Sequence, residues 1–294
     1  MISVWLRVIR IRFLLASIIA VSLGLAFHWH NANSLDWFSA FLTYAGVVAL
    51  HASVDLLNDY WDFRRGIDSE TKRTKMSGGT GVLPEGLLTP KSVYRAGIAF
   101  LILGGIIGMY FVITNGIVIA LILAFAILSI YFYSTKIVDS GLAEFFVALK
   151  GTLIVLGTFF IQSHNLNLDV LFGGLVVGVM SSLVLFISSF PDYDADKSKG
   201  RKTLVIIAGK KSASKIFWAF PVISTCIIVF GVLWNQFPTS ILISLIPLPL
   251  IMMAGNNLRQ NYRETDLLVP AMSKTLMFGR LTGTLFVVGI LIGM

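Results

Sequence analysis

The chain has 294 residues, of which 56% are hydrophobic and only 13% are charged, and its mean hydropathy is +0.84. A soluble core has no room for that much apolar surface, so the composition excludes a soluble protein and predicts an integral membrane protein. The net charge of +8 is explained by the bias of cytoplasmic loops toward Lys and Arg and by attraction to anionic lipid, which makes membrane lipid an expected partner and nucleic acid an unexpected one. The single Cys226 lies in an apolar run, which excludes an intramolecular disulfide and a cysteine metal site.

Nine apolar runs predict an all-α bundle, because each is close to the roughly 20 residues that a helix needs to cross the hydrocarbon layer. The first run is too long for a signal peptide and has no small-residue cleavage site in the right place, so we expect it to be retained. In chain order the runs cover residues 13–30, 37–57, 96–114, 116–135, 141–162, 168–190, 212–234, 238–255 and 275–293.

Lys and Arg fall on one side of this predicted topology. The loops near 31–36, 115, 163–169 and 235–238 contain neither residue type. The positive-inside rule then places the N-terminus in the cytoplasm, with every basic cluster on the same side of the cell membrane. These clusters are Arg7 to Arg12, Arg64 to Arg95, Lys136, Lys197 to Lys215 and Arg259 to Lys274.

Two short acidic segments, at 58–62 and 192–196, each lie where an apolar run meets a basic stretch. Within each segment two oxygen-bearing side chains are four residues apart, Asn58 with Asp62 and Asp192 with Asp196, so a helix through the segment projects both from one face. Two such turns that face each other form a cage for divalent cations. Mg²⁺ takes few carboxylates and fills its other positions with water and substrate phosphate, so the cage implies a phosphorylated substrate.

The two acidic segments end spans two and six, and a polar loop follows each. This spacing predicts a duplicated four-helix unit plus a ninth helix, in one transmembrane domain over residues 1–294. The pseudo-symmetry would bring the two acidic loops, 58–90 and 191–211, around one central cavity. We expect segments 64–90 and 197–211 to close over its cytoplasmic mouth when substrate binds.

Three stretches carry a resemblance to a known family. Asn58 to Asp68, with the sequence NDYWDFRRGID, resembles the first aspartate-rich motif of the UbiA superfamily of intramembrane prenyltransferases. Asp192 to Leu204, ending in Gly-Arg-Lys-Thr-Leu, is similar to the second motif, and Tyr131 to Lys136, followed by Gly141-Leu142, looks like the motif between spans four and five. The third acidic residue of the first motif, Asp68, and the loop 78–86 look like the menaquinone-type branch, whose acceptor is 1,4-dihydroxy-2-naphthoate.

The resemblance implies a prenyl diphosphate donor, two Mg²⁺ ions and an electron-rich acceptor. Carried over by position, Asn58 and Asp62 would hold one ion, and Asp192 and Asp196 the other. Diphosphate leaves with negative charge, which metal ions and basic side chains stabilise, while aromatic walls shield the allylic cation. The expected donor-binding set, beside the catalytic Asp62, Asp192, Asp196 and Lys136, is Asn58, Asp68, Tyr133, Arg10, Arg201 and Lys202.

Four further polar residues have no assigned role at this point. His51 and Asp55 share the face of span two that carries Asn58 and Asp62, and they would orient the acceptor or remove its proton, or form a buried pair with a structural role. Lys150 lies deep in span five, and Glu144 lies nearer the cytoplasmic face of the same span; function and structural pairing are both open for Lys150.

Alternatives remain at each level. The acceptor would instead be 4-hydroxybenzoate or a geranylgeranylglyceryl phosphate-type lipid precursor. The same metal cage would serve a lipid diphosphate phosphatase, and a secondary transporter would also show repeats and about nine spans, although its polar residues would cluster near the bilayer midplane. A long prenyl tail must leave the bundle sideways, and the glycines of spans three and six would pack helices closely or leave such a portal.

Overall fold

The computed structural model describes residues 1–70, 73–74 and 76–293, and over these residues the chain is helical, without β-strands. Thr71, Lys72, Lys75 and Met294 lie outside the described residues, so the predicted lid segment 64–90 is described only in part. The α-helices are α1 (Ile2–Val8), α2 (Ile11–Ala32), α3 (Trp37–Arg64), α4 (Ile67–Glu70), α5 (Pro90–Asn115), α6 (Ile117–Phe132), α7 (Val138–Ser140), α8 (Ala143–Ser163), α9 (Leu168–Ser188), α10 (Tyr193–Ser198), α11 (Leu204–Ala208), α12 (Lys210–Ile216), α13 (Ala219–Leu233), α14 (Leu248–Asn261) and α15 (Val269–Ile292). The π-helix η1 (Tyr133–Ile137) and the 3₁₀-helices η2 (Thr239–Leu245) and η3 (Thr265–Leu268) complete the elements.

Nine membrane-spanning segments are present in the described chain, which confirms the predicted number. Most ends agree with the sequence prediction within a few residues, but the ninth span begins at Thr265, well before the predicted residue 275. Pro270 explains part of this difference, because it lies in the first turn of α15, where a missing backbone N–H breaks no helical hydrogen bond. The spans are α2, α3, α5, α6 to α7, α8, α9, α12 to α13, η2 to α14 and η3 to α15.

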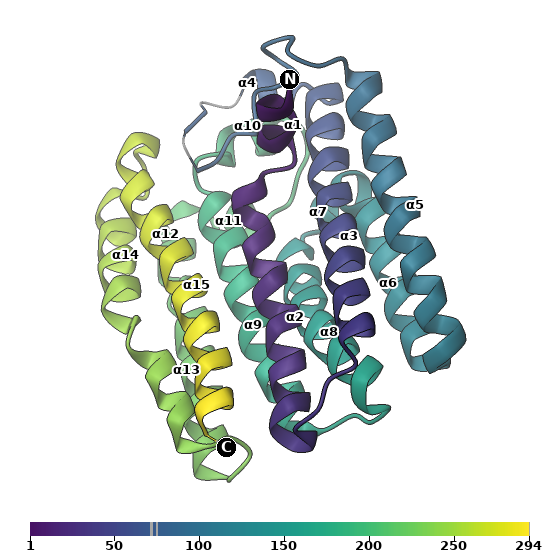
Figure 1. Ribbon diagram of the computed structural model, residues 1–294. Helices are drawn as coiled ribbons and strands as arrows, with labels where there is room; N and C mark the ends of the chain where they lie inside the picture. The colour runs from purple at the N-terminus through teal and green to yellow at the C-terminus, as the bar shows by residue number, and fades with distance from the viewer. Residues whose placement is uncertain (71–72, 75, 294) are drawn as a thin grey trace.

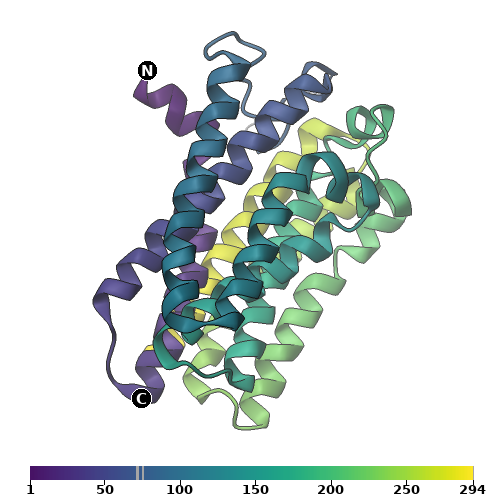
Figure 2. The ribbon, with the colours of Figure 1, turned by 90° about the vertical axis from the view of Figure 1, so that its right-hand side faces the viewer.

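The long helices lie side by side with roughly parallel axes (Figure 1, Figure 2), and the short α1 packs against α3 and α5 at one end of the bundle. Helices α2 and α9 are the most buried spans, and the largest apolar core joins them to α8, α13 and α15. Helices α5 and α6 are the least buried. The exposed apolar side chains of α5, such as Ile106 and Ile113, lie where a membrane protein meets lipid.

Glycines set how closely the central helices approach. A Cβ added at Gly151 of α8 would lie 2.8 Å from the Cα atom of Gly178 in α9, so a side chain larger than hydrogen would push these helices apart. On α5, a Cβ at Gly97 would lie 2.9 Å from the side chain of Leu57 in α3. At these positions the glycines of spans three and six therefore serve close packing, the first of the two readings that the sequence allowed.

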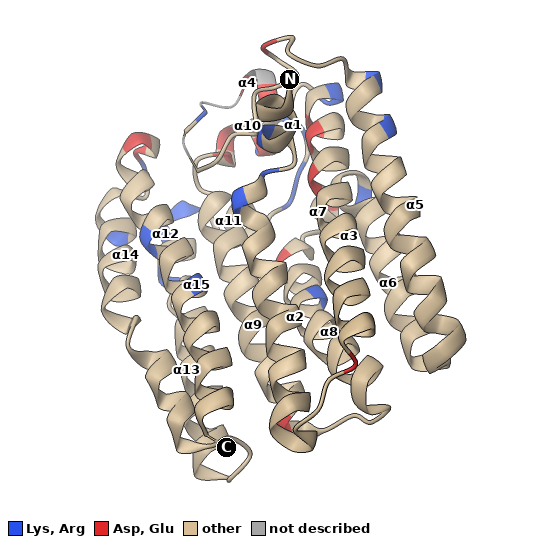
Figure 3. Cartoon of the chain, viewed as in Figure 1, with Lys and Arg blue, Asp and Glu red and all other residues tan. Residues whose placement is uncertain are grey.

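Lys and Arg residues, blue in the cartoon, gather toward the end of the bundle that carries α1, α4 and α10, whereas no blue residue lies at the opposite end (Figure 3). Helix α3 extends into this charged end. Its start is capped by Asp36, whose carboxylate accepts hydrogen bonds from the N–H groups of Phe38 and Ser39. The helix then continues without interruption to Arg64, so the first acidic segment is helical.

Candidate functional site

A cavity of about 280 Å³ opens in the bundle between α2, α3, η1, α8, α9 and α15. Both acidic segments contribute to its wall, although one follows the second span and the other follows the sixth. The predicted central cavity and the convergence of the two segments on it are therefore both present. The polar wall near the charged end includes Arg10, Asn58, Asp62, Asp192, Asp196 and Arg201.

The two acidic pairs reach the cavity from different local structures. Asn58 and Asp62 lie one turn apart on α3, as the i, i+4 spacing predicts. The second pair does not continue helix α9, which ends at Ser188. The chain turns, and Asp192 is the N-cap residue of the separate short helix α10. The N–H of Asp196 donates to the carbonyl of Asp192 at 2.8 Å, so this pair still shares one helical turn.

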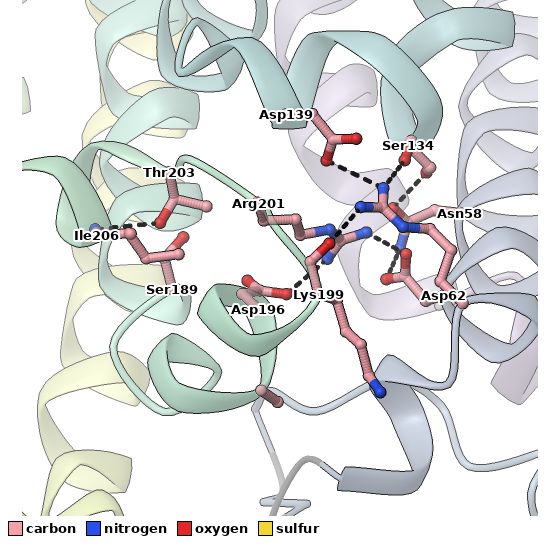
Figure 4. Close-up of polar contacts among 12 residues, drawn as sticks. Asn58, Asp62, Ser134, Asp139, Ser189, Asp196, Lys199, Arg201, Thr203 and Ile206 are labelled. Atoms are coloured by element: carbon pink, nitrogen blue, oxygen red, sulfur yellow. Dashed lines mark hydrogen bonds and ion pairs between the residues drawn. The ribbon is translucent and has the colours of Figure 1, made fainter.

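Arg201 joins the two acidic segments. Its guanidinium donates to the carboxylate of Asp62, and its Nη1 atom donates to Oδ1 of Asp196 at 2.9 Å (Figure 4). All three side chains are buried. A buried arginine between two carboxylates satisfies two charges that would otherwise repel each other, so the second loop is tied to the end of α3.

Asn58 is held by its neighbours. Its amide nitrogen donates to Oδ2 of Asp62 at 3.1 Å, and its oxygen accepts a hydrogen bond of 2.8 Å from the Ser134 hydroxyl. Ser134 belongs to the π-helix η1, whose wider turn also places Tyr133 on the cavity wall. The motif between spans four and five therefore meets the first acidic segment, a contact that the resemblance did not specify.

Arg65 binds the same region from outside the cavity. Its Nη1 atom donates to the carbonyl of Ser134 at 2.7 Å and to Asp139 at 3.0 Å, and its Nη2 atom donates to the carbonyl of Lys199 at 3.0 Å. Lys199 in turn forms an ion pair with Glu70. The loops after the two acidic segments are thus connected to each other and to η1.

The glycine-rich loop folds back onto α3. Gly78 and Gly79 adopt positive φ angles of 86° and 70° and line the cavity, a conformation that residues with a Cβ rarely adopt. Thr80 donates from its N–H and its hydroxyl to the carboxylate of Asp59, which is fully buried, and Arg10 lies 3.8 Å from the same carboxylate. Sequence reasoning assigned no role to Asp59, because its partners come from a distant loop. The Gly-Gly-Thr-Gly sequence was the available signal.

Three of the expected site residues, the catalytic Lys136 and the donor-binding Lys202 and Asp68, do not form the cavity wall. Lys136 and Lys202 are exposed side chains. Lys136 lies within the π-helical turn, which changes the register that an α-helix would give it relative to Tyr133. Asp68 is buried behind the wall, and a Cβ at Gly79 would overlap its carboxylate.

Glu144, which had no assigned role, contacts the later part of the second acidic loop. Its Oε1 atom accepts a hydrogen bond of 3.2 Å from the N–H of Leu204, the first residue of α11. This contact satisfies one of the N–H groups that a helix leaves free at its start. Glu144 is therefore placed to hold the end of the second acidic loop against α8.

Burial makes the carboxylates at the mouth hard to ionise in the absence of a cation. Burial, followed by the neighbouring carboxylate of Asp196, raises the pKa of Asp192 to about 7. Burial, with the charges of Asp62 and Asp59, raises the pKa of Asp68 to about 8. One carboxylate oxygen of each of Asp192 and Asp68 is buried without a hydrogen-bond partner in the described chain. Such oxygens are available to a cation.

These residues fit a magnesium ion whose coordination a substrate completes. Within the described chain, no three acidic, histidine or cysteine side chains converge on one point, so the protein alone does not enclose a cation. Mg²⁺ does not need such a cage, since it is usually held by one or two carboxylates together with water and substrate phosphate. Asp62, Asp192 and Asp196 supply carboxylates of that kind around one cavity.

Sequence comparisons agree with this arrangement. The sequence profile of the UbiA prenyltransferase family matches residues 15–291. The chain is 24% identical over 247 residues to the 1,4-dihydroxy-2-naphthoate octaprenyltransferase of Bacillus subtilis (strain 168), covering 83% of this chain and 78% of the relative. It is 26% identical over 304 residues to the enzyme of the same description from Escherichia coli (strain K12), covering 97% and 94%.

Solved structures share the fold. The apo structure of a UbiA homolog from Aeropyrum pernix K1 superposes with a TM-score of 0.72 at 17% identity, covering 94% of this chain and 98% of the other. A UbiA homolog from Archaeoglobus fulgidus bound to GPP and Mg²⁺ gives a TM-score of 0.62 at 16% identity, covering 96% and 99%. Because the family profile spans nearly the whole chain, this integral membrane protein belongs to the UbiA prenyltransferase family.

Proposed function

We propose that this prenyltransferase carries out Mg²⁺-dependent transfer of a prenyl chain from a polyprenyl diphosphate to an aromatic acceptor in the membrane. The observation that carries the proposal is the convergence of Asp62, Asp192 and Asp196 with Arg10 and Arg201 at one end of a cavity in the bundle. A diphosphate needs cations, and a prenyl chain needs an apolar path. The cavity offers both, because its walls away from these residues are mostly apolar.

In this proposal, Asn58 and Asp62 would hold one Mg²⁺ ion, and Asp192 and Asp196 would hold a second. The amide oxygen of Asn58 accepts from Ser134, so this oxygen would have to exchange that partner for the ion. When bound, the ions would offset the negative charge that develops on the departing diphosphate. The homolog from Archaeoglobus fulgidus bound to GPP and Mg²⁺ supports the use of a divalent ion.

The chain's own residues then prepare the reaction. The bond between the allylic carbon and the diphosphate oxygen breaks, and the electron pair leaves with the oxygen. Arg10 and Arg201 line the cavity and would donate to the diphosphate oxygens, and Arg201 would move from its carboxylate partners to do so. Lys136 and Lys202, exposed in this structure, would contribute only if the loops close. Tyr133, Phe13 and Phe146 line the cavity and would face the allylic cation and keep water away.

The acceptor ring completes the exchange. A ring carbon attacks the allylic cation, a carbon–carbon bond forms, and the same ring carbon loses its proton, which the released diphosphate takes up. The relatives in Bacillus subtilis and Escherichia coli favour 1,4-dihydroxy-2-naphthoate, an assignment that would place the chain in menaquinone biosynthesis. A solved structure described as digeranylgeranylglyceryl phosphate synthase, with a TM-score of 0.60 at 18% identity, keeps a glyceryl phosphate lipid as the alternative together with 4-hydroxybenzoate.

The membrane orientation is also part of the proposal. Basic side chains occupy the loops at the end that carries the acidic segments (Figure 3). The positive-inside rule then places the N-terminus and the mouth of the cavity on the cytoplasmic side of the cell membrane. A soluble, anionic aromatic acceptor would enter from that side.

A panel of acceptors tests the proposal. The purified protein in lipid is incubated with Mg²⁺, one labelled prenyl diphosphate and, in separate reactions, 1,4-dihydroxy-2-naphthoate, 4-hydroxybenzoate or a geranylgeranylglyceryl phosphate. We expect label on the naphthoate in preference to the others. Label recovered only as free prenol in every reaction would instead indicate a lipid diphosphate phosphatase, and unchanged donor throughout would refute transfer.

A further inference from the structure

The cavity has a second polar group of residues, deeper in the membrane than the acidic mouth. It consists of Ser17 on α2, His51 and Asp55 on α3, and Lys150 on α8, all of which line the cavity. On α3, Asp55 precedes Asp62 by about two turns, which places it about 10 Å further into the bundle. This deep polar group is therefore distinct from the residues that would hold diphosphate.

Lys150 is a cation without a direct partner in the described part of the chain. Its side chain lines the cavity and makes no hydrogen bond or ion pair with any residue in the described part of the chain. The opposite charge that acts on it across the cavity is that of Asp55. Lysines inside membrane spans are costly, so they usually pair with another group or face a functional cavity. An ammonium group on the wall of a cavity, without a hydrogen-bond or ion-pair partner, is suited to bind an anion.

Asp55 supplies a carboxylate oxygen that can accept a hydrogen bond. Its Oδ2 atom is buried and has no hydrogen-bond partner among the described residues, and Nε2 of His51 is 3.9 Å away, too far for a hydrogen bond. His51 is fixed on its other side, since its Nδ1 atom lies 2.6 Å from the hydroxyl of Ser17. The imidazole is thus held in one orientation beside a carboxylate whose free oxygen would accept a hydroxyl donor.

We propose that Lys150 is the specificity-determining residue for the acceptor and binds its negatively charged group, while Asp55 accepts a hydrogen bond from an acceptor hydroxyl. The proposal rests on the function proposed above and names the acceptor class as a hydroxyarene that carries a carboxylate. The aromatic side chains of Phe13, Tyr133 and Phe146 in the same wall favour a ring over a glyceryl phosphate. With the anion on Lys150 and diphosphate at the mouth, the ring lies between them.

Matched acceptors with and without the carboxylate measure this role. We compare 1,4-dihydroxy-2-naphthoate with 1,4-dihydroxynaphthalene in the wild type and in Lys150→Met and Lys150→Arg. The control variant is Lys91→Met, because Lys91 is exposed at the start of α5. Lys150→Met should raise KM for the naphthoate at least about tenfold, the loss expected for one hydrogen bond to a charged group. KM for the donor and the rate with the uncharged acceptor should change less than about twofold, and Lys150→Arg should recover part of the preference for the carboxylate.

The ratio of kcat/KM for 1,4-dihydroxy-2-naphthoate to that for 1,4-dihydroxynaphthalene is compared between Lys150→Met and the wild type. An equal ratio in the two proteins would overturn the proposal. Binding of 2-naphthoate, measured by calorimetry without Mg²⁺ or donor, gives an independent readout. We expect Lys150→Met to weaken this binding at least about tenfold and Lys91→Met to leave it unchanged. Equal binding by Lys150→Met and the wild type would also overturn the role of Lys150. Failure of the transfer reaction itself would appear differently, as no prenylated product from any acceptor while 2-naphthoate binding still depended on Lys150.

Discussion

Asp62 at the end of α3 and Asp196 in α10 accept hydrogen bonds from the same guanidinium, that of Arg201, although they belong to acidic segments after the second and sixth spans. This shared contact defines the mouth of the cavity. It gives the two carboxylates a common counter-charge when no metal ion is bound. It also places an arginine where a diphosphate would arrive, so one residue stabilises the empty site and is available to the substrate.

Both acidic segments are expected to be necessary for turnover. Asp62→Ala or Asp196→Ala should lower kcat at least about a hundredfold, in the range seen when one charge-stabilising group is removed. Asp194→Ala is the matched control, because Asp194 lies between Asp192 and Asp196 in sequence, yet its side chain is 85% exposed and pairs with Lys210. Steady-state prenyl transfer in lipid measures all three variants. Near-normal rates for Asp62→Ala or Asp196→Ala would contradict the assignment.

Removing the shared arginine should destabilise the protein more when Mg²⁺ is absent. Arg201→Ala leaves two buried carboxylates facing each other, and breaking a buried ion pair in this way typically costs about 3–5 kcal/mol. Thermal unfolding in detergent, with and without Mg²⁺, reports the effect. We expect a lower Tm for the variant without Mg²⁺ and partial recovery when the ion and a donor analogue are added. Equal Tm values for the variant and the wild type without Mg²⁺ would show that Arg201 does not hold the segments together.

Stability should depend on pH through Asp192. Its pKa in the folded protein is about 7, above the ordinary value of 3.8, so its contribution to stability is fully present below about 3.8 and is lost as the pH rises through about 7. Without metal, Asp192→Asn should therefore gain Tm relative to the wild type between pH 5 and pH 8. Adding Mg²⁺ should narrow the gap at pH 8, since the ion favours the ionised carboxylate. A difference that is constant across this pH range would count against the prediction.

The loops after the acidic segments should become protected when donor binds. Arg65, Glu70 and Lys199 already connect them, and the Gly78-Gly79 turn lines the cavity. Hydrogen exchange followed by mass spectrometry, with and without a non-hydrolysable donor analogue and Mg²⁺, should show slower exchange in 64–90 and 197–211. Glu70→Gln should weaken the connection and reduce this protection. No change in either loop on donor binding would rule out a closing lid.

The prenyl tail is expected to leave between α2, α9 and α15. A smaller cavity between these helices shares Ala16, Ser181, Val184, Leu276 and Arg280 with the main one. An open path does not measure length, so donors of two, four and eight isoprene units should react with only modest preference. Spans three and six were the sequence-based candidates for such a path, and of these only α9 borders it.

A variant in α15 tests that path. Gly279→Phe should slow the eight-unit donor at least tenfold, because a benzyl group at this position would fill the smaller cavity, an effect of about 1.4 kcal/mol in the barrier. The matched control is Gly279→Ala, since a Cβ there would lie 3.9 Å from the nearest atoms, in ordinary contact. Equal slowing of the two-unit donor would show a general packing defect. A sharp cutoff at the shortest donor in the wild type would mean a closed pocket.

The sequence predicts the span number and the acidic pairs because both depend on local pattern. Twenty apolar residues cross a bilayer wherever they occur, and two groups four residues apart share a face in any helix. The contacts of Arg201 and of Asp59 depend instead on where distant loops return, and no spacing encodes that. Lys136 shows the same limit, since a π-helical turn at η1 alters the face on which it lies.

The shared helix face of His51 and Asp55 was predictable, but whether Lys150 forms an ion pair with them was not. His51, Asp55 and Asn58 follow the helical repeat of α3, so their common orientation could be read from spacing. Whether Lys150 would pair with one of them depends on the separation of α3 and α8 across the cavity. In the described structure no hydrogen bond or ion pair joins Lys150 to these residues, which is why it becomes a candidate for acceptor binding.

The most direct test is product analysis of a single reaction in lipid vesicles, with a labelled polyprenyl diphosphate, 1,4-dihydroxy-2-naphthoate and Mg²⁺. We expect mass spectrometry to find the labelled chain bonded to a ring carbon of the acceptor, and the product to disappear with a chelator or with Asp196→Ala. Label that remains on the donor, or that appears only as free prenol while Mg²⁺ and acceptor are present, would contradict this expectation.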